Sequence, residues 1–275
     1  HTLSLHDALP ISRGRTGSLV FEAISCGALD LQVKADLCDP AERRALREKV
    51  RLLAGVQLPA GAGRRARAQP DQAAPPKGQL AGVIGIVAST GGPSALEAVI
   101  SRLPADFPAA VVIVQHLPQG FVDSFASWLA SAGPLEVVLA RDGDPLKPGR
   151  ISIAPDGHHL HVERDRLRLA SAVPSPGDHC PSGTVLLRSI ARNWGPRGAG
   201  VVLTGMGDDG CEGLAEIRRA GGPTFAQDAA TSILDGMPAV ARSSGAAAEI
   251  LALEAVGPRL HRLARAWFEA GVVSY

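Results

Sequence analysis

The sequence lacks an excess of charge of either sign and lacks long hydrophobic runs. Its 275 residues contain 28 Lys and Arg against 27 Asp and Glu, a formal net charge of +1, so charge gives no reason to expect a nucleic acid or a membrane surface as a partner. No apolar run approaches the roughly 20 residues that a spanning helix needs, so no membrane insertion is expected. Hydrophobic residues still make up 45% of the chain, which predicts a soluble protein with a sizeable core.

Cysteine pairs and a secretory signal are also missing. The four cysteines, Cys26, Cys38, Cys180 and Cys211, lie far apart and none forms a C-x-x-C pair. Without a signal peptide there is no reason to expect an oxidising compartment. We therefore expect free thiols and a cytoplasmic location.

The amino-terminal part of the chain divides into three stretches of different composition. The first, "HTLSLHDALPIS", has no initiator Met, no basic region and no continuous apolar run, so residues 1–16 are expected to be a non-native tail. Residues 17–56 have the composition of a folded segment. Residues 57–80 concentrate Pro, Gly, Ala and Gln without apolar periodicity, which is typical of a linker. Residues 81–275 are then the main predicted domain.

Strand-like and helix-like patterns alternate after the linker. A β-branched run at 83–87 is followed by apolar residues at helical spacing over 96–103, and the runs at 109–116 and 199–205 also precede helical patterns. Strands so uniformly apolar are typical of a sheet covered on both faces. The alternation predicts an α/β fold with a doubly wound, mostly parallel sheet and helices on both faces, as in Rossmann-like proteins.

Ser89 occupies the turn between the first predicted strand and the first helix of this domain. Gly91 and Gly92 allow a sharp turn there, and the free N–H groups of the helix start point into the same space. Such a turn can hold a phosphate or can present a nucleophile beside an oxyanion site. The turn by itself leaves both interpretations open.

Polar residues end three of the apolar runs, and these ends meet at one edge of a parallel sheet. The first run ends at Ser89, the second at His116, and the third leads through a glycine-rich turn to Asp208 and Asp209. A serine, a histidine and a carboxylate are the parts of an acyl-transfer triad. Helix capping by the serine or the aspartates, and a structural role for the histidine, explain the same residues.

The sequence around Ser89 fits neither of two common motifs for such a turn. The local sequence A-S-T-G-G is not the G-x-S-x-G of a nucleophile elbow. Neither does "GIVASTGG" fit the G-x-G-x-x-G of a dinucleotide site. Spacing alone therefore keeps the triad as one hypothesis among several.

Three motifs in order resemble the catalytic domain of the chemotaxis response-regulator protein-glutamate methylesterase family. They are S-T-G-G-P from Ser89, Q-H-x-P around His116 and T-G-M-G-x-D-G over 204–210, within a resemblance that covers about residues 82–265. Residues 81–275 would then be a methylesterase catalytic domain.

The resemblance implies hydrolysis of glutamate γ-methyl esters on methyl-accepting chemotaxis receptors, with release of methanol and with receptor glutamine deamidation as a second activity. Carried over by position, the nucleophile is Ser89, the base His116 and the orienting acid Asp209. The backbone N–H groups of Thr90 and Met206 would form the oxyanion hole. No metal or organic cofactor is implied.

The chain departs from the family pattern in two places. The family commonly reads H-R-P-S-x-D, whereas residues 179–184 read His-Cys-Pro-Ser-Gly-Thr, so Cys180 and Thr184 replace an arginine and an aspartate. An arginine there could pair with an acidic receptor helix, which Cys180 cannot do. Asp235 replaces an aromatic residue and is expected to place a charge near the cleft. A catalytically silent receptor-binding or scaffolding module with the same fold therefore stays open as an alternative.

Residues 17–56 resemble the end of a receiver domain. "GALDLQVKAD", residues 27–36, predicts a strand, and residues 39–56 predict a helix. The phosphoacceptor aspartate of a receiver would lie upstream, so we expect no action of the family's histidine kinase on this chain. A segment of about 40 residues is near the size at which isolated domains need staples, so we expect it to be mobile or loosely packed.

Two further patterns carry weaker predictions. "HHLHVE" places His159, His161 and Glu163 on one strand face, which fits either a metal site or the polar face of an exposed strand. Near the carboxyl end, Leu260 and Trp267 share the apolar face of a helix that is expected to pack on the sheet.

Overall fold

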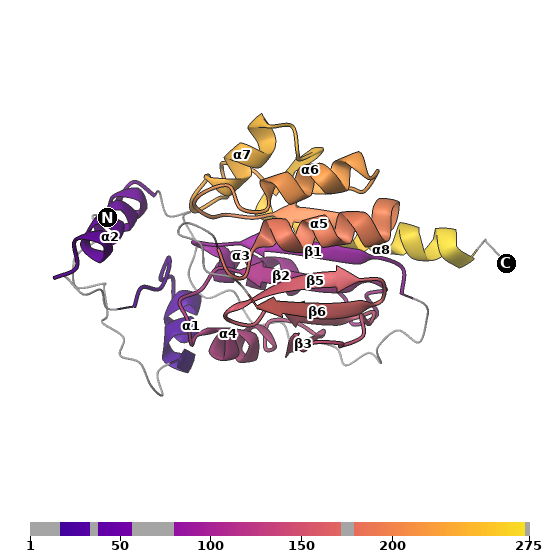
Figure 1. Ribbon diagram of the computed structural model, residues 1–275, viewed down its shortest axis with the longest axis horizontal. Helices are drawn as coiled ribbons and strands as arrows, with labels where there is room; N and C mark the ends of the chain where they lie inside the picture. The colour runs from indigo at the N-terminus through magenta and orange to yellow at the C-terminus, as the bar shows by residue number, and fades with distance from the viewer. Residues whose placement is uncertain (1–16, 34–37, 57–79, 172–178, 273–275) are drawn as a thin grey trace.

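The computed structural model describes residues 17–33, 38–56, 80–171 and 179–272 (Figure 1). In these residues seven strands form one parallel sheet in the order β3-β4-β2-β1-β7-β8-β9. The strands are β1 (Val83–Ala88), β2 (Ala110–Gln115), β3 (Glu136–Leu139), β4 (Arg150–Ile153), β7 (Gly198–Val202), β8 (Thr224–Gln227) and β9 (Glu249–Leu251). The predicted doubly wound sheet is confirmed.

Helices cover both faces of this sheet (Figure 1). One face carries α3 (Gly92–Ile100), α4 (Val122–Leu129) and α8 (Leu253–Val272). The other carries α5 (Gly183–Trp194), α6 (Cys211–Arg219), α7 (Met237–Ser243) and a hairpin of β5 (His158–Glu163) and β6 (Arg166–Ser171). A 3-10 turn, Gly195–Arg197, joins α5 to β7. Among the described residues no helix is long and apolar enough to cross a membrane.

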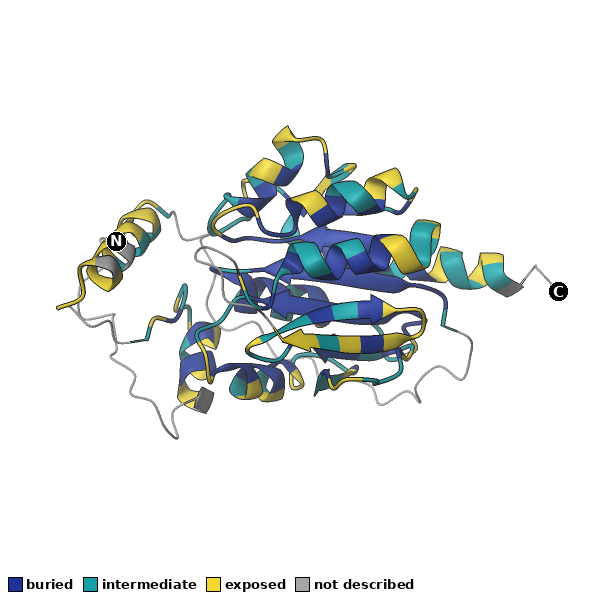
Figure 2. Cartoon of the chain, viewed as in Figure 1, coloured by how far each residue is buried: buried dark blue, intermediate teal, exposed yellow. Residues whose placement is uncertain are grey.

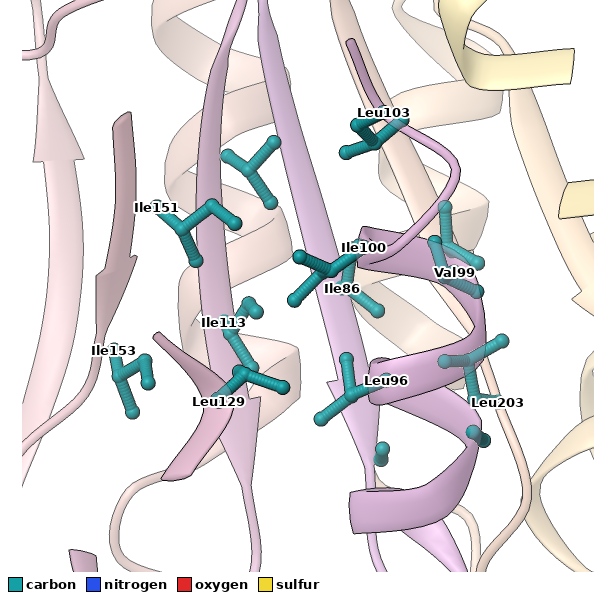
Figure 3. Close-up of a cluster of buried hydrophobic side chains, with 14 of the residues drawn as sticks. Ile86, Leu96, Val99, Ile100, Leu103, Ile113, Leu129, Ile151, Ile153 and Leu203 are labelled. Atoms are coloured by element: carbon teal, nitrogen blue, oxygen red, sulfur yellow. The ribbon is translucent and has the colours of Figure 1, made fainter. Parts of the chain in front are cut away.

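The central strands are buried along their whole length, as their uniformly apolar sequence requires (Figure 2). Alternate residues of β1 serve the two faces, so Ile86 packs with α3 while Val87 packs with α5. Figure 3 shows Ile86 and Ile113 of the two central strands beside Leu96 of α3.

Two glycine positions bring α5 unusually close to β1. A Cβ atom on Gly85 would come within 2.5 Å of Leu187 Cδ2, and a Cβ atom on Gly183 would overlap the side chain of Val87. Because Val87 is near the carboxyl end of β1, this packing places the first turn of α5 beside the residues that follow the strand.

The helix α1 (Gly17–Ser25) packs closely against α4, so the prediction of loose packing is wrong for this part of residues 17–56. Phe21 is fully buried, with its ring centroid 5.6 Å from that of Phe125 and 5.5 Å from that of Trp128. Trp128 Nε1 also donates a hydrogen bond to Ser25 Oγ at 3.0 Å. This buried aromatic cluster, together with the buried Val20 and Ile24, stabilises the docking of the helix.

The rest of the amino-terminal segment follows the predictions only in part. The helix α2 (Pro40–Ala54) forms as predicted, with mostly exposed side chains (Figure 2). The strand predicted over 27–36 is wrong for 28–33, which contain no strand because no neighbouring strand pairs with them there. Residues 34–37 lie outside the described part. That this segment ends a receiver domain stays a prediction.

The predicted tail, residues 1–16, and residues 57–79 of the predicted linker also lie outside the described residues. At the other end of the chain the predicted helix forms as α8, with Leu260 buried and Trp267 packed against the same core. The four cysteines, all within the described residues, form no disulfide there.

Candidate active site

The site lies at the carboxyl edge of the sheet, where the chain leaves β1, β2 and β7. Ala88 and Gln115, the last residues of β1 and β2, are register partners, so Ser89 and His116 leave neighbouring strands side by side. The His116 N–H donates to the Ala88 carbonyl at 3.0 Å, which extends the ladder by one step. In a doubly wound sheet this edge beside the central strands is where ligands bind.

Ser89 is held through its backbone, and its hydroxyl has no hydrogen-bond partner among the described residues. Its N–H donates to the Thr204 carbonyl at 3.0 Å, and its carbonyl accepts from the Gly92 N–H at 2.8 Å. Gly91 adopts a φ of 74°, a left-handed conformation that residues with a Cβ atom rarely adopt. The backbone is therefore fixed while Oγ remains available.

The side chain of Gln115, which the sequence interpretation passed over, ties the serine to the histidine. Its Nε2 donates to the Ser89 carbonyl at 2.8 Å and to the His116 carbonyl at 2.9 Å. A side chain at Gly92 would overlap the Gln115 amide, which explains a glycine at that position. The Q-H-x-P motif contained the signal for this contact, because the glutamine precedes the predicted base.

His116 and Asp209 are brought together from separate loops. His116 Nε2 lies 2.9 Å from Asp209 Oδ2, and the other ring nitrogen, Nδ1, is buried with no partner among the described residues. No hydrogen bond joins Ser89 Oγ to this ring in the described residues. Since Nε2 is taken by the carboxylate, Nδ1 is the nitrogen left to accept a proton, the reverse of the serine-protease arrangement.

Four donors surround the Asp209 carboxylate, which is 9% exposed. Besides the His116 ring, it accepts from the N–H of Gly183 at 2.6 Å, the N–H of Thr184 at 2.9 Å and Ser182 Oγ at 2.9 Å. The three are at the start of α5, where the helix dipole also favours a negative charge.

The environment keeps Asp209 ionised. Burial by itself would raise the pKa of its carboxyl group, but the hydrogen bond and charge of His116 oppose this. The N–H groups of Thr184 and Gly183 act in the same direction, so the pKa lies well below its ordinary value. An ionised carboxylate at Nε2 can orient the ring and stabilise an imidazolium.

Residues 182–184 therefore have a role that sequence interpretation missed. We expected the altered 179–184 segment to affect receptor binding, whereas Ser182 and Thr184 contact Asp209 directly. Thr184 Oγ1 also accepts from the Gly210 N–H at 2.8 Å. The sequence signal for this role was the serine itself, because serine is a preferred N-cap residue. Ser182 caps α5, and its hydroxyl accepts a hydrogen bond from the Val185 N–H at 3.4 Å.

Two more histidines border the site. The ring of His179 stacks on that of His116 with centroids 4.1 Å apart and planes 14° apart. His159 Nδ1 lies 3.3 Å from the Ser182 N–H and accepts from it. Burial, with a smaller effect of His159, lowers the pKa of His161.

The metal interpretation of the β5 histidines finds no support. Within the described ranges no three or more His, Cys, Asp or Glu residues are grouped so as to hold a metal ion. His159 instead belongs to the hydrogen bonds around Ser182.

The two candidate oxyanion donors lie on loops that approach each other at Ser89. Neither the Thr90 N–H nor the Met206 N–H donates to another described residue. A Cβ atom on Gly205 would come within 2.7 Å of Ser89 Cβ, so the absence of a side chain at Gly205 allows the loop before Met206 to lie against the serine.

Asp235, expected to place a charge near the cleft, forms an ion pair. Its carboxylate pairs with Arg242 through two hydrogen bonds of 2.8 and 2.5 Å. Gly205 and Asp235 also form an isolated bridge, which places Asp235 beside the residue before Met206.

Known proteins are similar to this chain in sequence. The family model described as CheB methylesterase matches residues 84–260. A protein-glutamate methylesterase/protein-glutamine glutaminase 3 of Anaeromyxobacter dehalogenans is 50% identical over 194 residues, which cover 70% of this chain and 57% of that protein. The protein of the same name from Myxococcus xanthus is 45% identical over 235 residues, 84% of this chain and 64% of its own length.

A solved structure is similar as well. The catalytic domain of Thermotoga maritima CheB methylesterase superposes with a TM-score of 0.63 at 34% identity, covering 66% of this chain and 98% of that one. This chain thus spans less than two thirds of the length of the two relatives above but nearly all of the solved catalytic domain.

Proposed function

Because the chain belongs to the CheB methylesterase family, we propose that it hydrolyses glutamate γ-methyl esters on methyl-accepting chemotaxis receptors and releases methanol. The double name of its relatives supports a second activity, deamidation of receptor glutamines. The proposal has the reaction take place in the cytoplasm, where free thiols persist. It does not include control by a histidine kinase.

The observation that carries this proposal is the contact between His116 Nε2 and the buried, ionised Asp209, with Nδ1 left unpartnered. A silent binding module would have no need for a carboxylate held by four donors against a histidine. The pair is what a general base needs: one nitrogen fixed by a negative charge and the other available.

In the proposed first half-reaction, Ser89 Oγ attacks the ester carbonyl carbon as His116 Nδ1 takes the hydroxyl proton. The oxyanion that forms binds the N–H groups of Thr90 and Met206. Asp209 stabilises the imidazolium through Nε2. The ring then gives the proton to the departing methoxide, so methanol leaves and a glutamyl ester of Ser89 remains.

In the second half-reaction, water attacks this glutamyl ester as His116 Nδ1 accepts its proton. Collapse of the new oxyanion releases the receptor glutamate, and the proton returns to Ser89 Oγ. With glutamine as substrate, the same steps release ammonia in place of methanol. The residues named hold or move every proton, so the proposed reaction requires no cofactor.

Methanol release from methylated receptor signalling helices tests the proposal directly. We expect the chain to release methanol in proportion to the receptor ester consumed. Ammonia release from receptors carrying glutamine at the same positions tests the second activity. A folded chain that binds receptor and releases neither product would instead support the silent module.

A further inference from the structure

Thr204, in the loop after β7, is completely buried, and both of its backbone polar groups are hydrogen-bonded. Its carbonyl accepts from the Ser89 N–H at 3.0 Å, and its N–H donates to Gln227 Oε1 at 2.9 Å. Thr204 therefore links the nucleophile-bearing turn to the neighbouring strand β8, where Gln227 is the last residue.

The hydroxyl of Thr204 makes a second set of contacts. Oγ1 accepts from the Leu234 N–H at 2.9 Å and lies 3.0 Å from the Thr90 carbonyl and 3.2 Å from the Leu234 carbonyl. Because a hydroxyl has one proton, it can donate to one carbonyl at a time, and the Thr90 carbonyl is the nearer.

These contacts connect the segments that hold the two candidate oxyanion donors, the N–H groups of Thr90 and Met206. Thr90 is in the turn after β1, whereas Met206 is in the loop after β7. Leu234 holds the latter loop, because its carbonyl accepts from the Gly205 N–H at 3.0 Å, and the Gly205 carbonyl accepts from the Met237 N–H at 2.9 Å. Through its hydroxyl, Thr204 thus connects Thr90 to the segment that anchors Gly205.

We propose that Thr204 is a positioning residue that sets the spacing between the Thr90 and Met206 N–H groups in the oxyanion hole. It touches neither substrate nor reacting atoms. Oxyanion stabilisation depends on donors held at a fixed position before the reaction, so a shift of one loop relative to the other lowers the rate. The inference rests on the proposed function for the role of the two N–H groups.

The chain offers a matched control for a purely structural role. Thr224 is 1% exposed, and its Oγ1 accepts from the Ala248 N–H at 2.9 Å, at the start of β8 and away from the site. Thr204→Val and Thr224→Val each replace a buried hydroxyl by a methyl group of similar size. Thr204→Val leaves the Leu234 N–H without its acceptor, whereas in Thr224→Val the Ala248 N–H keeps the Thr224 carbonyl as an acceptor at 3.1 Å. Both variants are expected to lower the free energy of unfolding.

Two rates separate positioning from stability: methanol release, with kcat and KM measured separately, and phosphonylation of Ser89 by a fluorophosphonate, followed by mass spectrometry. We expect Thr204→Val to lower kcat and the labelling rate by about 10- to 100-fold, as for a misplaced catalytic group, with KM unchanged. Thr204→Ser retains the hydroxyl and is expected to restore both rates. Thr224→Val is expected to change neither.

Equal rates in Thr204→Val and Thr224→Val would overturn the inference, as would a loss that Thr204→Ser does not restore. If Thr204→Val does not fold, Thr204→Cys provides the comparison with Thr204→Ser, because its thiol is a weak donor. Ser89 labelling without methanol release by the unmutated chain would remove the proposed function, and the labelling rates would still decide the role of Thr204.

Discussion

His116 and Asp209 contact each other through Nε2 and Oδ2, 2.9 Å apart, although 93 positions separate them in the chain. The contact exists because the chain leaves β2 and β7 at the same sheet edge. The N–H groups of Gly183 and Thr184, at the start of α5, also fix the carboxylate by donating hydrogen bonds to it. Because Nε2 is taken by the carboxylate, Nδ1 is the ring nitrogen left without a partner among the described residues.

The neighbouring aspartates give the sharpest test of this contact. We expect Asp209→Asn to reduce methanol release by up to about 10⁴-fold, because an amide can neither fix the ring tautomer nor stabilise the imidazolium. Asp208→Asn is the control, since Asp208 is exposed. Inactivation by Asp208→Asn with full activity in Asp209→Asn would mean that the other aspartate faces the histidine in solution.

Asp209 is also expected to shape the acid stability of the protein. Its folded-state pKa lies below the ordinary 3.8. In acid, the unfolded chain therefore binds a proton at Asp209 at pH values where the folded chain does not. The ionised Asp209 carboxylate therefore contributes its full stabilisation above pH 3.8. This contribution to the free energy of unfolding is lost as the pH falls from 3.8 toward the folded-state pKa.

Urea unfolding of the unmutated chain and Asp209→Asn, from neutral pH down to about pH 2, measures this effect. We expect the unmutated chain to lose stability more steeply in acid than the variant. Parallel curves would show that the folded and unfolded chains bind protons alike at Asp209.

Ser182 is expected to contribute to both stability and rate. Ser182→Ala removes the N-cap of α5 and one donor to Asp209, which should lower the free energy of unfolding by about 1 kcal/mol. Because Asp209 keeps its other donors, methanol release should fall less than in Asp209→Asn. Ser101→Ala, at the exposed carboxyl end of α3, is the control, and an equal response of both variants would argue against a role for Ser182.

The docking of α1 predicts a large effect at one position of the amino-terminal segment. Phe21→Ala should lower the free energy of unfolding by about 3 kcal/mol or more, because it opens a cavity beside Phe125 and Trp128. Leu19, on the same helix, is 58% exposed, and Leu19→Ala should change little. Equal, small effects in both variants would show that α1 leaves the domain in solution.

The sequence was sufficient to predict the sheet and the places of Ser89 and His116. Apolar runs reveal buried parallel strands, and polar residues at their ends meet at one edge for geometric reasons. Asp209 was separable from Asp208 only through the T-G-M-G-x-D-G motif.

The remaining contacts depend on packing between distant segments. Ser182 reaches Asp209 because Gly183 lets α5 lie against Val87, and no local pattern encodes that approach. In the same way, the strand predicted over 27–36 had the composition of a strand but found no pairing partner over its described residues.

The central claim is that Ser89 is the nucleophile of a methylesterase, and methanol release by Ser89→Ala tests it most directly. Ser94→Ala is the matched control, because Ser94 is a half-buried serine in the first turn of α3. We expect Ser89→Ala to keep its cooperative unfolding and to release no methanol from methylated receptor, while Ser94→Ala behaves like the unmutated chain. Substantial methanol release by folded Ser89→Ala would contradict the account.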